Sequence, residues 1–225
     1  MRFEEAVRRL AVLPDVLPEG PPELLPIFVE TGEPRPRPGW GTAERDARPA
    51  AVLVLLFADD AGDARLVLTE RTDRGGHHSG EVSFPGGRAE PGDADLVATA
   101  LREAREEVGL DAGAAGVRVL GTLSMQWIPV SNFTVTPVLA VAERRPLMTP
   151  QPSEVAAILE APVAAFIPGA PLLDVEREIR GHAIRYAAYP VEGLAVWGMT
   201  ARVLGGLGAW LGREMEGGPG MRTDP

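Results

Sequence analysis

The distribution of apolar residues along the chain predicts strands interleaved with helices. An apolar run at Ala50–Ala58 and an alternating segment at Arg65–Glu70 flank an acidic turn at Asp59–Asp63, which is the pattern of a β-hairpin. Further strands are expected at Val117–Ser124, Thr134–Ala142 and Ile184–Ala188. Helices are expected at Met1–Leu13, in the middle of the chain before Gly109, at Ser153–Leu159 and at Leu194–Leu211. Because strands and helices do not alternate regularly, we expect an α/β fold with a mixed sheet between helices.

The central helix has clear signals along one face and at both ends. Four apolar residues recur at helical spacing: Val97, Leu101, Ala104 and Val108. Asp93 or Asp95 can cap the N-terminus, and Gly109 can end the helix in a left-handed conformation. The apolar stripe therefore predicts a helix with one buried face.

The same helix carries Glu103, Glu106 and Glu107 within five residues. Spacings of three and four place these carboxylates close together, where like charges repel. One interpretation is a solvated acidic helix face; the other is a site for a hard divalent cation, which prefers carboxylate oxygens. Upstream, Phe84–Gly87 ends in two glycines, Gly86 and Gly87, which let a backbone approach a ligand closely. This neighbouring loop favours the cation site.

Together the loop and the helix resemble the Nudix box, G-x5-E-x7-R-E-U-x-E-E-x-G-U, where U is an apolar residue. The second half of the box matches at Arg102, Glu103, Ala104, Glu106, Glu107, Gly109 and Leu110. The first half departs, since Ala94 stands where the box has Glu and Arg88 where it has Gly. The loop is one residue longer than the general box, which leaves Asp93 and Asp95 as alternative partners of Arg102.

The resemblance implies a Nudix-type α/β/α sandwich with a loop-helix-loop catalytic motif. It implies that Glu103, Glu106 and Glu107 hold Mg²⁺ or Mn²⁺ and that Arg102 braces the loop. Nudix enzymes often place a further acidic group late in the chain, and Glu154 stands in such a segment. The alternative for Glu154 is a glutamate at a helix N-terminus, where the macrodipole favours a negative charge.

Other segments are similar to one Nudix subgroup, the coenzyme A diphosphatases. The sequence Leu68–Arg71, followed by Gly80–Gly87, resembles the motif that precedes the box in that subgroup, although Gly76 stands where an arginine is usual. Arg71 and Arg74 are then candidate phosphate contacts, against the alternative of plain surface charge. The implied reaction is cleavage of coenzyme A to 3′,5′-ADP and 4′-phosphopantetheine. ADP-ribose or another nucleoside diphosphate derivative is the alternative substrate, and a non-catalytic Nudix-fold binding module is the alternative function.

Composition limits the partners of this 225-residue chain. A formal net charge of −10 argues against nucleic-acid binding by phosphate neutralisation, whereas a local arginine cluster still suits a phosphorylated small molecule. No signal peptide or membrane-spanning run is apparent and there is no cysteine, so we expect a cytoplasmic protein with no membrane partner; a homodimer is compatible with the sequence. We expect an N-terminal helix and Pro-rich arm over 1–49, a Nudix hydrolase domain over 50–212 and a disordered tail over 213–225.

Overall fold

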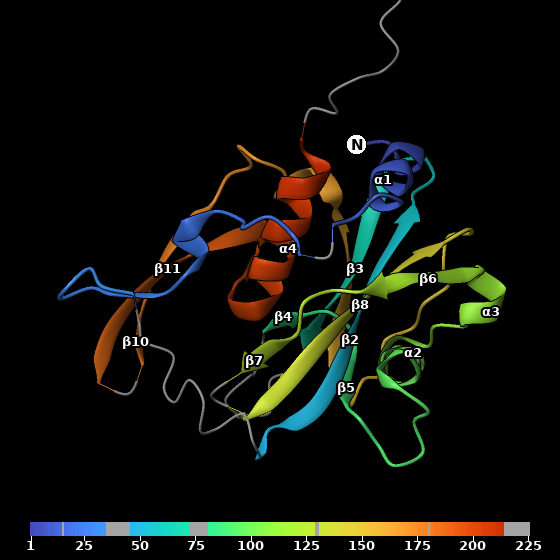
Figure 1. The fold of residues 1–225 in the computed structure, drawn as a ribbon, viewed down its shortest axis with the longest axis horizontal. Helices are drawn as coiled ribbons and strands as arrows, with labels where there is room; N and C mark the ends of the chain where they lie inside the picture. Colours follow the sequence, from blue (N-terminus) through green and yellow to red (C-terminus); the bar gives the residue numbers. More distant parts are fainter. Residues whose placement is uncertain (15, 35–45, 73–80, 129–130, 180, 214–225) are drawn as a thin grey trace, which may run out of the picture.

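A computed structural model describes residues 1–14, 16–34, 46–72, 81–128, 131–179 and 181–213 of the chain. A large mixed sheet forms its centre, with helix α2 (Leu96–Val108) on one face. Helix α4 (Gly198–Leu211) and helix α1 (Phe3–Leu10) lie on the other face, together with a smaller sheet (Figure 1). Three short helical segments also occur in the described residues: the 3-10 turns Pro22–Leu24 and Val163–Phe166, and α3 (Ala112–Ala115).

Strands β2 (Arg48–Ala58) and β8 (Phe133–Ala142) run parallel at the centre of the large sheet. On the far side of β8, β6 (Val117–Thr122) and β7 (Gln126–Ile128) pair with it antiparallel. On the other side, β3 (Ala64–Arg71) forms a hairpin with β2 and pairs along its length with β9 (Val155–Pro162). Beyond the hairpin end, β4 (Val82–Ser83) pairs with β3 and β5 (Gly86–Arg88) pairs with β2.

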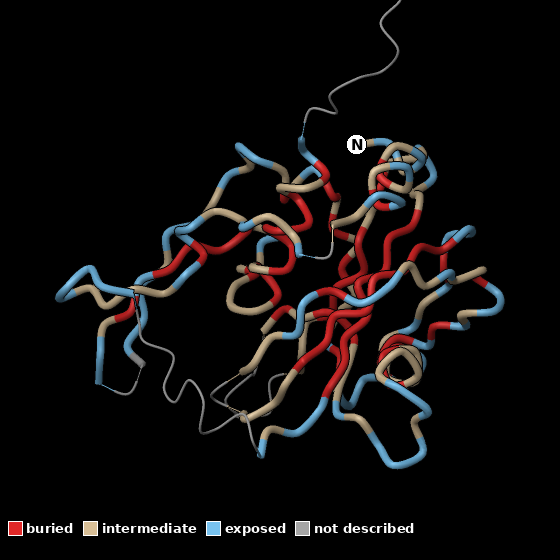
Figure 2. The backbone as a smooth tube through the Cα atoms, in the orientation of Figure 1, coloured by how far each residue is buried: buried red, intermediate tan, exposed pale blue. Residues whose placement is uncertain are grey.

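The apolar run of β2 is buried on both faces because successive side chains point to opposite sides of the sheet (Figure 2). One set packs with Ala100, Ala104 and Val108 of α2: Ala51, Leu53, Leu55 and Phe57. The other set packs in the core that includes α1 and α4: Ala50, Val52, Val54 and Leu56. A continuous apolar strand therefore joins two hydrophobic cores.

The smaller sheet is built on β11 (His182–Val191). Its antiparallel neighbours are β1 (Ile27–Phe28), β10 (Leu173–Ile179) and β12 (Leu194–Val196). The segment between α1 and β1 packs against this region and against α4, and Leu24 within it is buried. The first part of the Pro-rich arm is thus tied to the C-terminal elements of the fold.

Most of the predicted elements are present, but two predictions are wrong. The segment Ser153–Leu159, predicted as a helix, contributes to strand β9 because pairing with the edge of β3 overrides the helical propensity of its Ala and Leu residues. The predicted helix Leu194–Leu211 begins only at Gly198, since Leu194–Val196 pairs with β11 as β12. Residues 214–225 of the predicted tail lie outside the described residues. None of the helices in the described ranges is long and apolar enough to cross a membrane.

Candidate active site on helix α2

Helix α2 begins and ends where the sequence indicates. The Asp95 carboxylate accepts a hydrogen bond of 2.8 Å from the Ala98 N–H, so Asp95 is the N-cap. Gly109 ends the helix with φ +66°, which is the left-handed conformation that glycine adopts without strain. The ends fixed in this way place Glu103 and Glu107 on the side of the helix that faces β5.

Arg102 connects the loop before α2 to the acidic face of the helix. Its Nε and Nη2 donate to the two carboxylate oxygens of Asp93 at 2.9 and 3.1 Å. Its Nη1 donates to Glu103 at 3.0 Å and to Glu106 at 3.1 Å, and Nη2 also donates to the Arg88 carbonyl oxygen at 3.0 Å. Asp93 is therefore the partner of Arg102, whereas Asp95 caps the helix N-terminus.

Asp93 is held by more than Arg102. Thr99, which is fully buried, donates its hydroxyl to Asp93 at 2.8 Å, and the Glu90 N–H donates at 2.9 Å. The hydrogen bond from Arg102, followed by the one from the Glu90 N–H, lowers the pKa of Asp93 below its usual range. No sequence pattern indicated a role for Thr99, because that role depends on a loop conformation that brings Asp93 back over the first turn of the helix.

We expect Arg102→Ala to reduce both stability and activity. It removes the charged partner of a hydrogen-bonded carboxylate and frees Glu103 and Glu106, so we expect a loss of about 2–4 kcal/mol in the free energy of unfolding. Urea denaturation at pH 7 measures this loss, and Arg105→Ala, at an exposed position on the same helix, is the matched control. A loss below about 1 kcal/mol with unchanged activity would mean that Arg102 is an ordinary surface residue.

Strand β5 brings glycine backbone against the carboxylates of α2. The Gly86 N–H donates to Oε2 of Glu107 at 3.0 Å. A Cβ placed on Gly87 would lie 2.5 Å from Oε1 of Glu103, and one on Gly86 would lie 2.4 Å from the Ala51 carbonyl oxygen. Both positions therefore require glycine for close packing.

Burial dominates the electrostatics of Glu107 and Glu103. Desolvation raises the pKa of Glu107 to about 7, against the opposing effects of the Gly86 N–H and Arg71. Desolvation also raises the pKa of Glu103, with Arg102 acting in the opposite direction. The site thus keeps two carboxylates side by side in surroundings that disfavour their negative charges.

Arg71 and Glu154 lie at the same site although they are far apart in sequence. Arg71 ends β3 with its guanidinium 4.0 Å from Glu107, and Glu154 directly precedes β9, the partner strand of β3. Arg71 pairs with Val155, the residue that follows Glu154, and the charge of Glu154 adds to the raised pKa values of Glu103 and Glu107. Glu154 is not at a helix N-terminus, because β9 follows it. Arg74 lies outside the described residues.

The arrangement suits a divalent cation at Glu103 and Glu107. A cation there would offset the cost of burying two neighbouring carboxylates, and carboxylate oxygens are the ligands that Mg²⁺ and Mn²⁺ accept. Glu106 is exposed and bonded to Arg102. Within the described ranges, no three His, Asp or Glu side chains already converge closely enough to hold a metal ion. The fit therefore rests on the buried Glu107 and the half-buried Glu103.

Comparison with known families identifies this architecture. The family model of the NUDIX domain matches residues 47–174, which contain the large sheet with β5, and helix α2. The chain belongs to the Nudix family. The predicted Nudix-type α/β/α sandwich is thereby confirmed.

Nudix relatives from plants and bacteria resemble the chain over most of its length. It is 39% identical over 163 residues to "Nudix hydrolase 22, chloroplastic" of Arabidopsis thaliana, which covers 70% of this chain and 53% of the relative. It is 35% identical over 175 residues to "Uncharacterized Nudix hydrolase NudL" of Yersinia enterocolitica, covering 76% and 84%. The chain therefore spans about half the length of the plant relative. A crystal structure of a Nudix hydrolase from M. smegmatis, RenU, aligns at a TM-score of 0.44 with 24% identity, covering 53% of this chain and 73% of that one.

Proposed function

We propose that the chain is a metal-dependent Nudix diphosphatase, and that its substrate is coenzyme A or a derivative. The observation that carries the proposal is the Glu107 carboxylate, which is buried on α2, bonded to the Gly86 N–H and adjacent to Glu103. Burying a carboxylate beside a second carboxylate raises its pKa and lowers the stability of the folded protein. Such a cost is expected at a functional site, where the reaction requires the buried charge.

The residues of the chain have distinct parts in this reaction. Glu103 and Glu107 would hold a Mg²⁺ or Mn²⁺ ion, with Glu106 as a third ligand once released from Arg102. When bound, the ion would stabilise charge on the phosphoryl oxygens and acidify a water molecule. Arg102 orients Glu103 through the hydrogen bond between them. Glu154, which is exposed and close to both glutamates, would serve as a proton acceptor.

The groups around β5 and the sequence motif that leads to it support the proposed substrate class. Gly86 and Gly87 bring the backbone of β5 against the carboxylates of α2, and Arg71 supplies a cationic donor for a phosphate at the same edge. The resemblance of Leu68–Arg71 and Gly80–Gly87 to the coenzyme A diphosphatase motif favours coenzyme A over ADP-ribose. The relatives carry the name Nudix hydrolase, which specifies no substrate. The assignment of coenzyme A is therefore our proposal and rests on the resemblance of this motif.

A substrate panel tests the proposal. Coenzyme A, 3′-dephospho-coenzyme A, ADP-ribose and a dinucleoside diphosphate are incubated with Mg²⁺ or Mn²⁺, and the products are separated by anion-exchange chromatography. We expect 3′,5′-ADP and 4′-phosphopantetheine from coenzyme A at the highest kcat/KM. A higher kcat/KM on ADP-ribose would support the alternative substrate, and the absence of any cleavage would support a binding module.

We expect Arg71→Ala to reduce the preference for coenzyme A over 3′-dephospho-coenzyme A. A lost charged hydrogen bond costs about 1.5–3 kcal/mol, which corresponds to roughly ten-fold or more in the ratio of kcat/KM values. Arg118→Ala, an exposed arginine on β6, is the control for loss of one positive charge. If Arg71→Ala lowers kcat/KM equally on both substrates, Arg71 contacts a group that they share and not the 3′-phosphate.

A further inference from the structure

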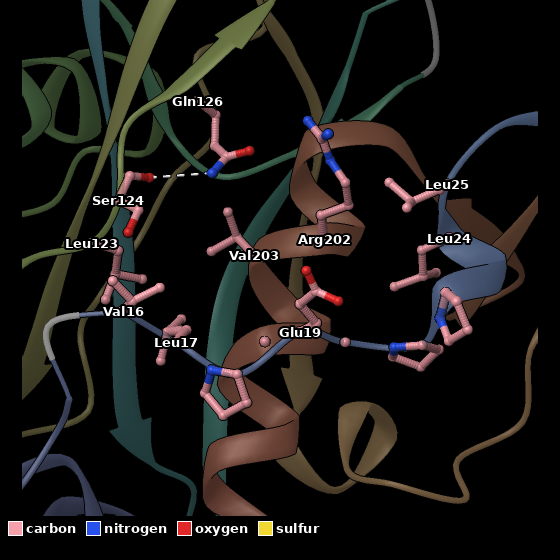
Figure 3. Close-up of a pocket in the computed structure, with 15 residues that line it drawn as sticks. Val16, Leu17, Glu19, Leu24, Leu25, Leu123, Ser124, Gln126, Arg202 and Val203 are labelled. Atoms are coloured by element: carbon pink, nitrogen blue, oxygen red, sulfur yellow. Dashed lines mark hydrogen bonds between the residues drawn. The ribbon is translucent and has the colours of Figure 1, made fainter. Parts of the chain in front are cut away.

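A cavity of about 340 Å³ lies between the N-terminal segment, the connection from β6 to β7, and α4 (Figure 3). Its volume falls in the range of roughly 300–1,000 Å³ typical of small-molecule sites. Leu24, Leu123 and Val203 line it as buried side chains from three separate parts of the chain, and the more exposed Val16 and Leu25 also contribute. We call this cavity the arm pocket.

The lining of the arm pocket is mainly apolar and carries no net charge. Glu19 and Arg202 are the charged residues among the described residues that line it, and their charges are opposite. Ser124 and Gln126 add a hydroxyl and an amide, joined by a hydrogen bond from the Gln126 amide to the Ser124 carbonyl oxygen. Such a lining suits a neutral chain with a few polar groups and does not suit a phosphate.

Close packing of backbone against α4 fixes one wall of the arm pocket. A Cβ on Gly205 would lie 2.9 Å from Cδ1 of Leu24, and a Cβ on Gly206 would lie 2.9 Å from the Pro18 carbonyl oxygen. A Cβ on Gly20 would in turn lie 2.8 Å from the Gly205 backbone. The N-terminal segment therefore packs directly against the backbone of α4 at Gly205 and Gly206 and forms one wall of the pocket.

Leu123, which lines the arm pocket, lies in one row of residues across the strands with Gly86 of the candidate active site. The Leu123 N–H donates to the Pro137 carbonyl oxygen at 2.8 Å, Pro137 pairs with Val52, and Val52 pairs with Gly86. Since neighbouring strands are about 4.8 Å apart, three steps place Leu123 roughly 15 Å from Gly86. Gly86 is the residue whose N–H binds Glu107.

Glycine backbone separates the two faces of the sheet at the active-site end of this row. Leu123 belongs to the core on the α4 face, whereas the carboxylates lie on the α2 face. Gly86 and Gly87 of β5 place no side chain between them. Among the described strands β5 pairs with β2 alone and so forms the edge of the sheet at this point, and an extended substituent of about 15 Å that leaves a diphosphate at β5 around this edge has the length to span the separation from Leu123.

We propose that the arm pocket binds the neutral, chain-like substituent that the diphosphate substrate carries beyond the bond that is cleaved. The proposal rests on the proposed diphosphatase function and specifies one part of its substrate class. A chain with amide and methyl groups, such as the pantetheine arm of coenzyme A, satisfies both the apolar lining and the polar groups of Ser124 and Gln126.

Substitutions at the pocket, compared on two substrates, test the proposal. Leu25→Glu introduces a charge at a position that is 44% exposed, and Ser124→Trp fills the cavity from an exposed position, so both variants should fold. We expect each to lower kcat/KM on coenzyme A about ten-fold or more, mainly through KM, and to change kcat/KM on ADP-ribose less than about two-fold. Leu173→Glu is the matched control, because Leu173 is 42% exposed on β10 and does not line the cavity.

A binding measurement separates failure of this inference from failure of the proposed function. Saturation-transfer NMR with pantetheine alone should show contact with the wild-type chain and with Leu173→Glu, and loss of contact with Leu25→Glu. The same result without hydrolysis of any diphosphate would support the arm pocket and overturn the proposed function. Hydrolysis of coenzyme A with no effect of either pocket variant would overturn the arm pocket. An equal loss on ADP-ribose would also overturn it, since the nucleoside that both substrates share would then be the occupant.

Discussion

Replacing Glu103 by Gln should lower kcat/KM by more than about a hundred-fold while the protein remains folded. The substitution keeps the volume beside Gly87, where space is tight, but removes a negatively charged oxygen from the proposed cation site. Substitutions of groups that only orient metal ligands cost about 10–100-fold, so loss of a ligand should exceed that range. Steady-state kinetics over a series of Mn²⁺ concentrations measures the effect.

The kinetics of Glu103→Gln also distinguish a ligand from a structural residue. If Glu103 binds the metal, the Mn²⁺ concentration for half-maximal activity should rise in the variant, while circular dichroism and melting temperature stay close to those of the wild type. Glu143→Gln makes the same change of charge at an exposed position after β8 and should behave as wild type. Unchanged turnover in Glu103→Gln would remove Glu103 from the site.

The second large effect that we expect is a gain of stability in Glu107→Gln when no metal is present. Burial raises the pKa of Glu107 from 4.5 to about 7, so the folded state favours the protonated carboxyl. Below about pH 4.5 the carboxyl is protonated in both the folded and unfolded states and no penalty exists. As the pH rises from 4.5 through 7, the unfolded state ionises first and the folded state loses stability, up to about 3 kcal/mol above pH 8.

Glutamine is neutral at every pH, and its carbonyl oxygen can still accept the hydrogen bond from the Gly86 N–H. In EDTA, Glu107→Gln should therefore be more stable than the wild type by about 3 kcal/mol at pH 8, with the difference closing near pH 4.5. Urea denaturation across this pH range measures the difference, and Glu143→Gln again serves as the control. A variant less stable than the wild type at pH 8 would show that the buried carboxylate is favourable in the folded state, contrary to the pKa shift.

The sequence was sufficient to predict the parts of the site that depend on local spacing. Helix α2, its capping by one of two aspartates, its end at Gly109 and the clustering of its glutamates all follow from residues within one short segment. The choice between Asp93 and Asp95 was not predictable, since it depends on how the longer loop folds back over Thr99. The hydrogen bond from Gly86 to Glu107 joins residues 21 positions apart and depends on how β5 packs beneath α2.

Elements that form through distant pairing were the hardest to predict. Strand β9 has a composition that suits a helix, and it is extended because β3 offers an unpaired edge. Strand β1 has two residues and no periodic signal, and it exists because Ile27 and Phe28 pair with Arg185 and Ile184. The helix α4 begins only at Gly198 because the preceding strand β12 pairs with β11. The apolar residues continue across both elements, so the sequence pattern did not indicate the boundary.

The packing of the N-terminal segment on α4 has a consequence for the order of folding. The Trp210 indole N–H donates to the Arg9 carbonyl oxygen, Arg9 donates to the Leu211 carbonyl oxygen, and Gly20 lies against Gly205. These contacts join segments that are far apart in the sequence, so their loop-closure entropy is offset only once α4 has formed and packed. We therefore expect the segment that holds Leu17 and Leu24 to reach its final position late in folding, with the apolar surface of both residues exposed until then.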